Sequence, residues 1–120
     1  MGNAVRGGVN SQLAEWLEEE LPGLERELGV KVSFLPAGLN DQDYKARLAL
    51  DIRSGRGAEV MVIDQFWVPE FAAAKFLMPL DRYYREWPLR EEFFQPIQEM
   101  GSFGGHEFMV VWEADVRMIF

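Results

Sequence analysis

A short apolar run that ends at an acid constrains the fold of this chain more than any other feature. Val60 to Ile63 are four apolar residues without polar alternation, and Asp64 follows directly. Such a run is typical of a strand covered on both faces, as in a parallel sheet with a helix layer on each side. The run therefore predicts an α/β domain in which residues 59–63 form a buried strand.

The remaining elements agree with that architecture. Leucines at helical spacing predict a helix over 11–28, which Pro22-Gly23 is expected to kink or split. Alternating apolar residues predict a strand over 30–35. A helix is expected over 42–54, with Tyr44, Leu48 and Ile52 as its apolar stripe and Gly55 as its stop. The other expected elements are helices over 69–76, 81–86 and 90–100, a hairpin over 101–112 that turns at Gly104-Gly105, and a strand over 115–120. Their order indicates an α/β domain with right-handed crossovers.

Charge and composition narrow the possible ligands. The chain carries 20 acidic and 12 basic residues, a net charge of −8, which argues against nucleic acid and against an anionic membrane surface. Neutral and cationic ligands remain open. The chain has no cysteine, so disulfides and thiolate metal sites are excluded. The one histidine, His106, follows the Gly-Gly turn and is expected to be an exposed turn residue. We expect no metal site and no cofactor.

The distribution of apolar residues bears on membrane insertion and on export. No run of the sequence reaches the ~20 apolar residues that a membrane span needs. The first ten residues, MGNAVRGGVN, lack the apolar stretch of a secretory signal. We therefore expect neither a membrane span nor a signal peptide within these 120 residues.

The end of the predicted strand 59–63 is the first candidate site. In an open α/β sheet, ligands bind beyond the carboxyl ends of the strands, and Asp64, Phe66 and Trp67 follow that end. A ring can lie against the apolar face of a ligand, and a carboxylate accepts hydroxyl or ammonium protons. Sugars offer both C–H faces and hydroxyls. On spacing alone, the simpler interpretation is that the two rings pack against the start of the next helix.

A pair of acids near the end of the chain is the second candidate. Glu113 and Asp115 lie two residues apart and would share one face of a strand. They could be the acid and nucleophile of a glycosidase, which need a separation of ~5 Å or more. The sequence favours one solvated and one ligand-binding carboxylate. It contains neither a phosphate-binding loop nor a nucleophile elbow, so we predict no catalytic residue.

A distributed pattern resembles a known family. The series Ser54-Gly55, Glu59-Val60, Asp64, Trp67 and Phe71-Ala72 resembles the extracellular solute-binding proteins of bacterial ABC sugar importers, of the maltose-binding type. The resemblance runs from about residue 10 to the last residue. Two departures stand out: Glu59-Val60 replaces the family's Asp-Val, and residues 108–111 lack the proline of its hairpin exit.

The resemblance implies a fold and a role. The fold would be a three-layer lobe like that of periplasmic binding proteins, with a mixed, mostly parallel sheet flanked by helices. Sugar would lie between two lobes, and closure would present the receptor to a membrane permease, in the periplasm or outside the cell. Carried over by position, Asp64, Phe66, Trp67 and Asp115 fall where the family contacts ligand. Asn10 falls in a loop that lines the cleft.

The resemblance also implies that residues 1–120 are part of an N-terminal lobe, because the family's chains are longer and begin with an additional strand. We therefore expect this chain alone to bind sugar weakly and to self-associate through uncovered strand edges, with Val116–Phe120 at the contact. Two other functions stay open. The charge of −8 permits a cationic, polyamine-like solute, and Glu113 with Asp115 would suit a glycoside hydrolase.

Overall fold

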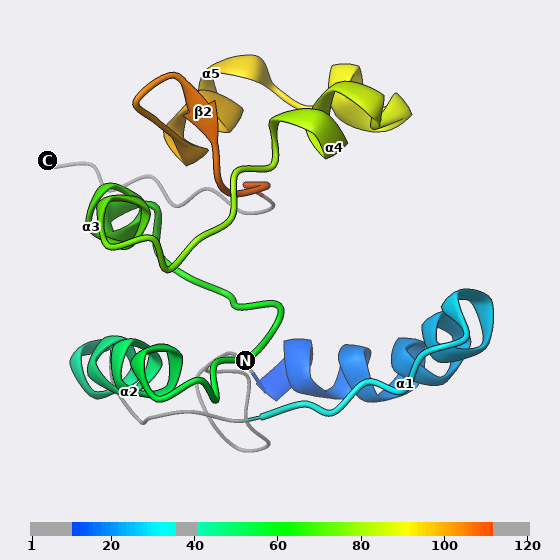
Figure 1. Cartoon of the computed structure of the whole chain (residues 1–120). Coiled ribbons are helices and arrows are strands. Elements are labelled where there is room, and N and C mark those ends of the chain that lie inside the picture. Colours follow the sequence, from blue (N-terminus) through cyan, green and yellow to red (C-terminus); the bar gives the residue numbers. More distant parts are fainter. Residues whose placement is uncertain (1–10, 36–40, 112–120) are drawn as a thin grey trace, which may run out of the picture. The chain divides into compact units, whose positions relative to one another are not determined.

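The computed structural model describes residues 11–35 and 41–111, which belong to two compact units, Met1–Val62 and Ile63–Phe120 (Figure 1). The first unit contains helices α1 (Ser11–Leu28) and α2 (Asp41–Arg53). The second unit contains short elements, namely η1 (Gln65–Trp67), α3 (Val68–Ala73), α4 (Asp81–Glu86), η2 (Pro88–Glu92), α5 (Gln95–Gln98), η3 (Glu99–Gly101), β1 (Ser102–Phe103) and β2 (His106–Glu107).

Helix α1 confirms the helix predicted over 11–28, but the predicted split does not occur. Pro22 lies inside one continuous helix. A proline in this position lacks the N–H that would bond to the preceding turn. On its other side, the Pro22 carbonyl accepts a hydrogen bond from Arg26 Nε at 3.0 Å. The helix-forming effect of the amphipathic leucine pattern is therefore greater than the helix-breaking effect of Pro22.

Helix α2 follows its predicted stripe and stop. Tyr44 and Leu48, one turn apart, are both buried. The helix ends through Gly55, whose φ of 72° only glycine adopts freely. There the N–H of Arg56 donates to the carbonyl of Asp51 at 2.8 Å, the wide bond of a Schellman motif. The predicted glycine stop is confirmed.

The strands predicted over 30–35 and 59–63 do not form among the described residues, and this is the main correction to the sequence analysis. Backbone groups of both segments bond to helix side chains. The N–H of Val32 donates to Glu25 Oε1 at 2.7 Å, and the carbonyl of Val62 accepts the Tyr44 hydroxyl at 2.5 Å. A strand needs such groups for its ladder. The mixed parallel sheet is therefore not seen in residues 11–35 and 41–111, and the strand expected over 115–120 lies outside them.

Helix α3 stops earlier than the predicted residue 76 because Lys75 adopts a left-handed conformation, with φ of 59°. The N–H of Phe76 then donates to the carbonyl of Phe71 at 2.8 Å, and that of Lys75 to Ala72 at 3.0 Å. This is again a Schellman motif, with lysine where glycine is usual. The sequence analysis missed it because no glycine marks the stop.

The helix predicted over 90–100 is broken into η2, α5 and η3. In a continuous helix the ring of Pro96 would clash with the carbonyl of Glu92, four residues earlier. The chain avoids this clash by an extended backbone at Phe93 and Phe94. Pro96 then lies in the first turn of a new helix, where its missing N–H has no consequence.

The hairpin is confirmed. Strands β1 and β2 pair antiparallel, with Ser102 opposite Glu107 and Phe103 opposite His106. Gly104 and Gly105 form the turn with φ of 61° and 83°, as a two-residue turn of this kind requires. Within the described parts of the chain this is the only ladder.

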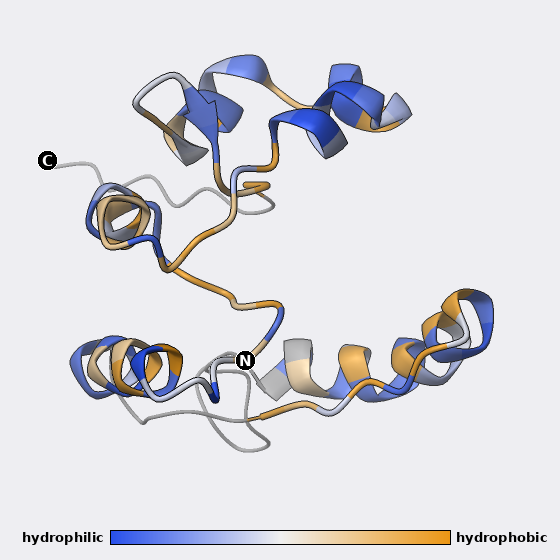
Figure 2. Cartoon of the chain, viewed as in Figure 1, coloured by the Kyte–Doolittle hydropathy of each residue, from blue (hydrophilic) through white to orange (hydrophobic). Residues whose placement is uncertain are grey.

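Apolar segments and buried side chains hold the second unit together. Figure 2 shows that the residues on both sides of α3 are mostly hydrophobic. Val68 and Phe71 of α3 are fully buried, and the ring of Phe71 contacts that of Phe76 edge to face at 5.7 Å. Burial of such side chains is the main stabilising contribution here.

A buried glutamine fixes the end of the described chain. The side-chain amide of Gln98 donates from Nε2 to the carbonyl of Val111 at 2.7 Å and accepts its N–H at 3.3 Å through Oε1. Gln98 and Val111 are both about 95% buried. One side chain thus satisfies both backbone groups of Val111, as a neighbouring strand would.

We expect Gln98→Leu to lower the free energy of unfolding by about 2–3 kcal/mol, because both Val111 groups would stay buried without a partner. Gln95→Leu is the matched control, since Gln95 is exposed and its side chain donates to the exposed Glu99 at 3.3 Å; it should change stability by about 0.5 kcal/mol or less. Urea denaturation followed by tryptophan fluorescence measures both. Equal stability of the two variants would contradict the role of Gln98.

Candidate functional site

Asp64 forms the start of the predicted ligand-binding segment and caps it. Its backbone is extended, and its Oδ1 accepts the N–H of Phe66 at 3.1 Å, at the beginning of η1. The carbonyl of Asp64 accepts the N–H of Trp67 at 3.0 Å. Aspartate is well suited to this capping position because its short carboxylate reaches the free N–H groups of the first turn. The side chain is exposed, so Oδ2 faces solvent.

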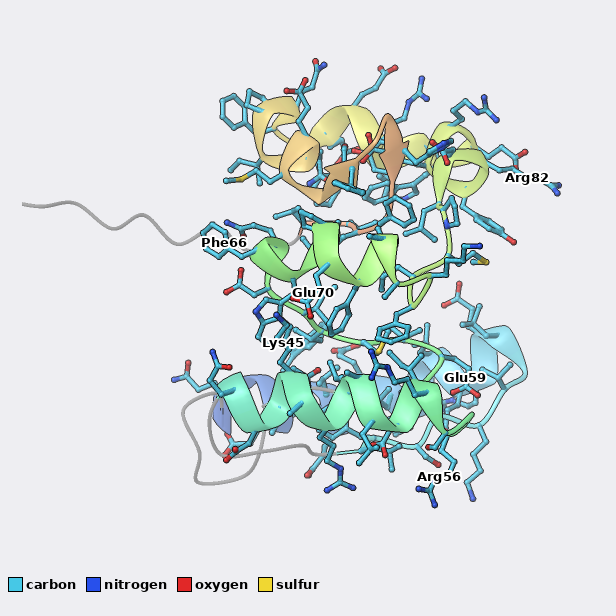
Figure 3. The ribbon with its side chains drawn as sticks, turned by 60° about the vertical axis from the view of Figure 1, so that its left-hand side comes forward. Lys45, Arg56, Glu59, Phe66, Glu70 and Arg82 are labelled. Atoms are coloured by element: carbon cyan, nitrogen blue, oxygen red, sulfur yellow. The ribbon has the colours of Figure 1, made fainter. Side chains whose placement is uncertain are left out.

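The two aromatic residues of this segment have different surroundings. The side chain of Phe66 is 78% exposed and extends away from the ribbon (Figure 3). Trp67 is half-buried, and its ring centroid lies 6.2 Å from that of the buried Phe71. Packing against the next helix, the alternative left open by the sequence, therefore describes part of the environment of Trp67. It does not describe Phe66.

The structure brings the predicted site residues Asp64, Phe66 and Trp67 together in one turn. Asn10, Glu113 and Asp115 lie outside the described residues.

A pocket lies elsewhere in the same unit. It is a pocket of about 390 Å³ lined by α4 and its flanks, with Leu80, Tyr83, Tyr84, Glu86, Trp87, Pro88 and Val110 as its walls. The rings of Tyr84 and Trp87 meet edge to face, with centroids 5.9 Å apart. Apolar pockets of this size with a few polar groups are typical of small-molecule sites. The sequence analysis missed it, because Val110 is far from α4 in the chain.

The hairpin is held to the start of α4 by Asp81. His106 Nδ1 lies 3.1 Å from Asp81 Oδ2, and the N–H of Glu107 donates to Asp81 Oδ1 at 3.4 Å. The N–H of Leu80 donates to the carbonyl of Glu107 at 2.7 Å. His106 is therefore an exposed residue near a turn, as expected, but it also has an acidic partner 25 residues earlier.

Two ionisable groups around α4 have shifted pKa values. Partial burial raises the pKa of Asp81, but the hydrogen bonds from His106 and Glu107 and the charge of His106 outweigh it, so the pKa lies below the usual 3.8. Burial raises the pKa of Tyr84, and the nearby charge of Glu107 adds to this, while Arg90 acts in the opposite direction. The wall of the pocket formed by Tyr84 is therefore neutral at ordinary pH.

Two further properties of the described residues bear on the kind of site. They contain no group of three or more His, Asp or Glu side chains that could hold a metal ion. Among the helices that the structure describes, none combines the length and apolar character needed to cross a membrane.

An aromatic pocket with a few polar groups is typical of a protein that binds small molecules, and the same unit also carries an exposed ring beside an acidic cap. The sequence comparison identifies the family. Residues 10–99 match the model of the bacterial extracellular solute-binding proteins, so the chain belongs to this family. No curated protein gives a significant match to the chain.

Membership of the family defines the coarse function. Its members are binding proteins rather than enzymes, and they bind the substrate for ABC transport, with a small-molecule ligand and a permease as partners. The family indicates a periplasmic or extracellular location, and its domain has the fold of periplasmic binding proteins.

We expect the link through Asp81 to weaken in acid. Because the pKa of Asp81 is lowered in the folded state, its stabilising contribution is complete above about pH 4 and is lost as the pH falls through the folded-state pKa. Asp81→Asn should therefore destabilise the protein at pH 7 and destabilise it less at pH 2. Glu91→Gln is the control, because the Glu91 side chain is 84% exposed. Urea denaturation at both pH values measures the difference. A stability gap between Asp81→Asn and wild type that stays the same at both would be inconsistent with this account.

Proposed function

We propose that the solute is a carbohydrate and that Phe66 and Asp64 contact it. The observation that carries the proposal is the exposed ring of Phe66, at 78%, next to a carboxylate held in place by its cap. A flat apolar ring in solvent suits the C–H face of a sugar. The free Asp64 Oδ2 suits its hydroxyl groups. Both are fixed by one short turn, so they approach a ligand without ordering a flexible loop.

Trp67, Asn10 and Asp115 would complete the site. The contact between Trp67 and Phe71 supports a positioning role for Trp67, which would set the direction of the turn that presents Phe66. Asn10 and Asp115 enter through the resemblance to sugar-binding members of the family. In the full-length protein, Asp115→Ala should weaken sugar binding by about 1.5–3 kcal/mol in calorimetry, the scale of hydrogen bonds to a charged group.

The proposal extends to the architecture and partners. Residues 1–120 would be part of the N-terminal lobe of a maltose-binding-type receptor, with the three-layer arrangement and mixed sheet of that group. The permease would be that of a sugar importer. A glycoside hydrolase that uses Glu113 and Asp115 is disfavoured by a family of binding proteins. A polyamine-like solute at Asp64 remains the second candidate, favoured by the charge of −8.

Self-association through strand edges is a further part of the proposal. Val30 and Val60, in the two segments predicted to be strands, are 50% and 78% exposed. Exposed β-branched residues in extended segments favour pairing with another chain. Sedimentation velocity over a range of concentrations tests this: a dimer or larger species supports it, and a monomer at every concentration contradicts it.

Isothermal titration calorimetry with maltose, other neutral oligosaccharides and spermidine tests the ligand class. In a two-lobe protein that contains this lobe, we expect saturable binding of a neutral sugar, weakened about tenfold by Phe66→Ala, which removes an exposed stacking surface without opening the core. Phe94→Ala is the matched control, since Phe94 is 69% exposed in the same unit. Unchanged affinity of Phe66→Ala would contradict the stacking role, and binding of spermidine alone would replace carbohydrate by the cationic solute.

Variants of Asp64 separate its two roles. Asn caps a helix about as well as Asp, so Asp64→Asn should preserve the turn while removing the charge. We expect it to keep wild-type stability and to bind the sugar at least about tenfold more weakly, because a charged acceptor is lost. If Asp64→Asn binds as the wild type does, Asp64 serves only as a cap.

A further inference from the structure

The pocket beside α4 is not part of the proposed sugar site. None of its lining residues belongs to the turn of residues 64–67, and all of them lie in the second unit. Figure 2 colours α4 as hydrophilic, because hydropathy scales score tyrosine, arginine and acids alike as polar. The rings of Tyr83, Tyr84 and Trp87 nevertheless give the pocket an aromatic wall.

The rings form a corner and not a flat platform. Tyr84 and Trp87 are inclined at 63°, with centroids 5.9 Å apart. The other side of Trp87 contacts Phe93 at 4.8 Å, which holds the indole in place. Tyr83 is 59% exposed. These two inclined rings line one pocket together with Tyr83, and a space bounded by rings at an angle suits a compact group more than a flat sugar ring.

The charges around the pocket favour a cation. Glu86 lines the pocket, and its partner Arg82 lies 3.4 Å away with both side chains more than 60% exposed, so that ion pair is weak and can be exchanged. Figure 3 shows Arg82 extending outward from the ribbon. Glu107 adds a negative charge near Tyr84. The whole chain has a net charge of −8.

The guanidinium group of Arg90 opposes the negative charge around the pocket. Arg90 lowers the pKa of Tyr84, so its positive charge also reaches the pocket wall. It is not among the lining residues, and its side chain is bound elsewhere, with Nη1 donating to the Arg85 carbonyl at 3.2 Å and Nη2 lying 3.8 Å from Glu91. The carboxylate of Glu86 therefore remains the only charged group among the lining residues.

We propose that this pocket is a second ligand site, for a small organic ammonium group, and preferentially a quaternary one. Such a cation would be held by the faces of Tyr84, Trp87 and Tyr83 and neutralised by Glu86. Aromatic cages with a nearby acid recognise quaternary ammonium through the ring quadrupole, which a neutral group of the same shape does not use. The inference is independent of the carbohydrate proposal, since it uses none of the same residues.

The probes are choline and its neutral isostere 3,3-dimethyl-1-butanol. Choline added to ¹⁵N-labelled protein should shift the indole signal of Trp87 with a dissociation constant of about 1–10 mM, as expected for a partly exposed cation–π site. The neutral isostere should bind about tenfold more weakly. Equal binding of the two compounds would overturn the ammonium assignment. The absence of any shift of Trp87 at about 100 mM choline would overturn the site.

Substitutions of the lining residues test which side chains contact the cation. Trp87→Leu and Tyr83→Leu should each weaken choline binding about fivefold or more, and Glu86→Gln about threefold. Trp16→Leu and Glu19→Gln, exposed residues of the first unit, are the matched controls and should bind as the wild type does. If Trp87→Leu fails to fold because it loses two ring contacts, the exposed Tyr83 and Glu86 variants decide the outcome. Wild-type affinity in both would contradict the proposal.

Discussion

The bond between Asp81 and the hairpin is the constraint on which most of the second unit depends. Asp81 begins α4, and its carboxylate reaches both the ring of His106 and the N–H of Glu107 in β2. A two-stranded hairpin with two residues in each strand is only marginally stable alone. Anchoring it to α4 also places Val110, three residues after β2, in the lining of the pocket that contains Tyr84 and Trp87. The pocket therefore exists because an acid and a histidine 25 residues apart are joined.

Two kinds of surface arise from this arrangement, and they differ in how the aromatic rings are held. Phe66 is presented by a capped turn and has solvent around most of its ring. Tyr84 and Trp87 contact each other at a steep angle and line an open pocket. A single open face suits a flat neutral ligand, and a corner with one carboxylate suits a compact cation. Both ligands agree with the acidic charge of the chain.

The sequence predicted local features well and long-range features poorly. Gly55 and Gly104-Gly105 were found because a positive φ leaves a clear mark in the sequence. The stop at Lys75 leaves no such mark. The strands over 30–35 and 59–63 were predicted from apolar patterns, but pairing decides whether a strand forms, and Glu25 and Tyr44 bond to the groups that a ladder would use.

Asp64, Phe66 and Trp67 were located by a rule about strand ends, although no strand precedes them in the described structure. The hydrogen bonds between the Gln98 side chain and the Val111 backbone leave no pattern in the sequence, because they join positions 13 residues apart through one side chain.

The most direct test of the central claim, that the exposed turn of residues 64–67 contacts a sugar, is ¹⁹F NMR of protein labelled with fluorotryptophan. Each tryptophan gives its own signal, and single Trp→Phe variants assign the signals. On titration with a neutral oligosaccharide, the signal of Trp67 should move in a saturable way, because the ligand would lie against the neighbouring Phe66, while the signals of Trp16 and Trp87 stay in place. A sugar that binds without moving the signal of Trp67, or that moves the signal of Trp87 instead, would contradict the account.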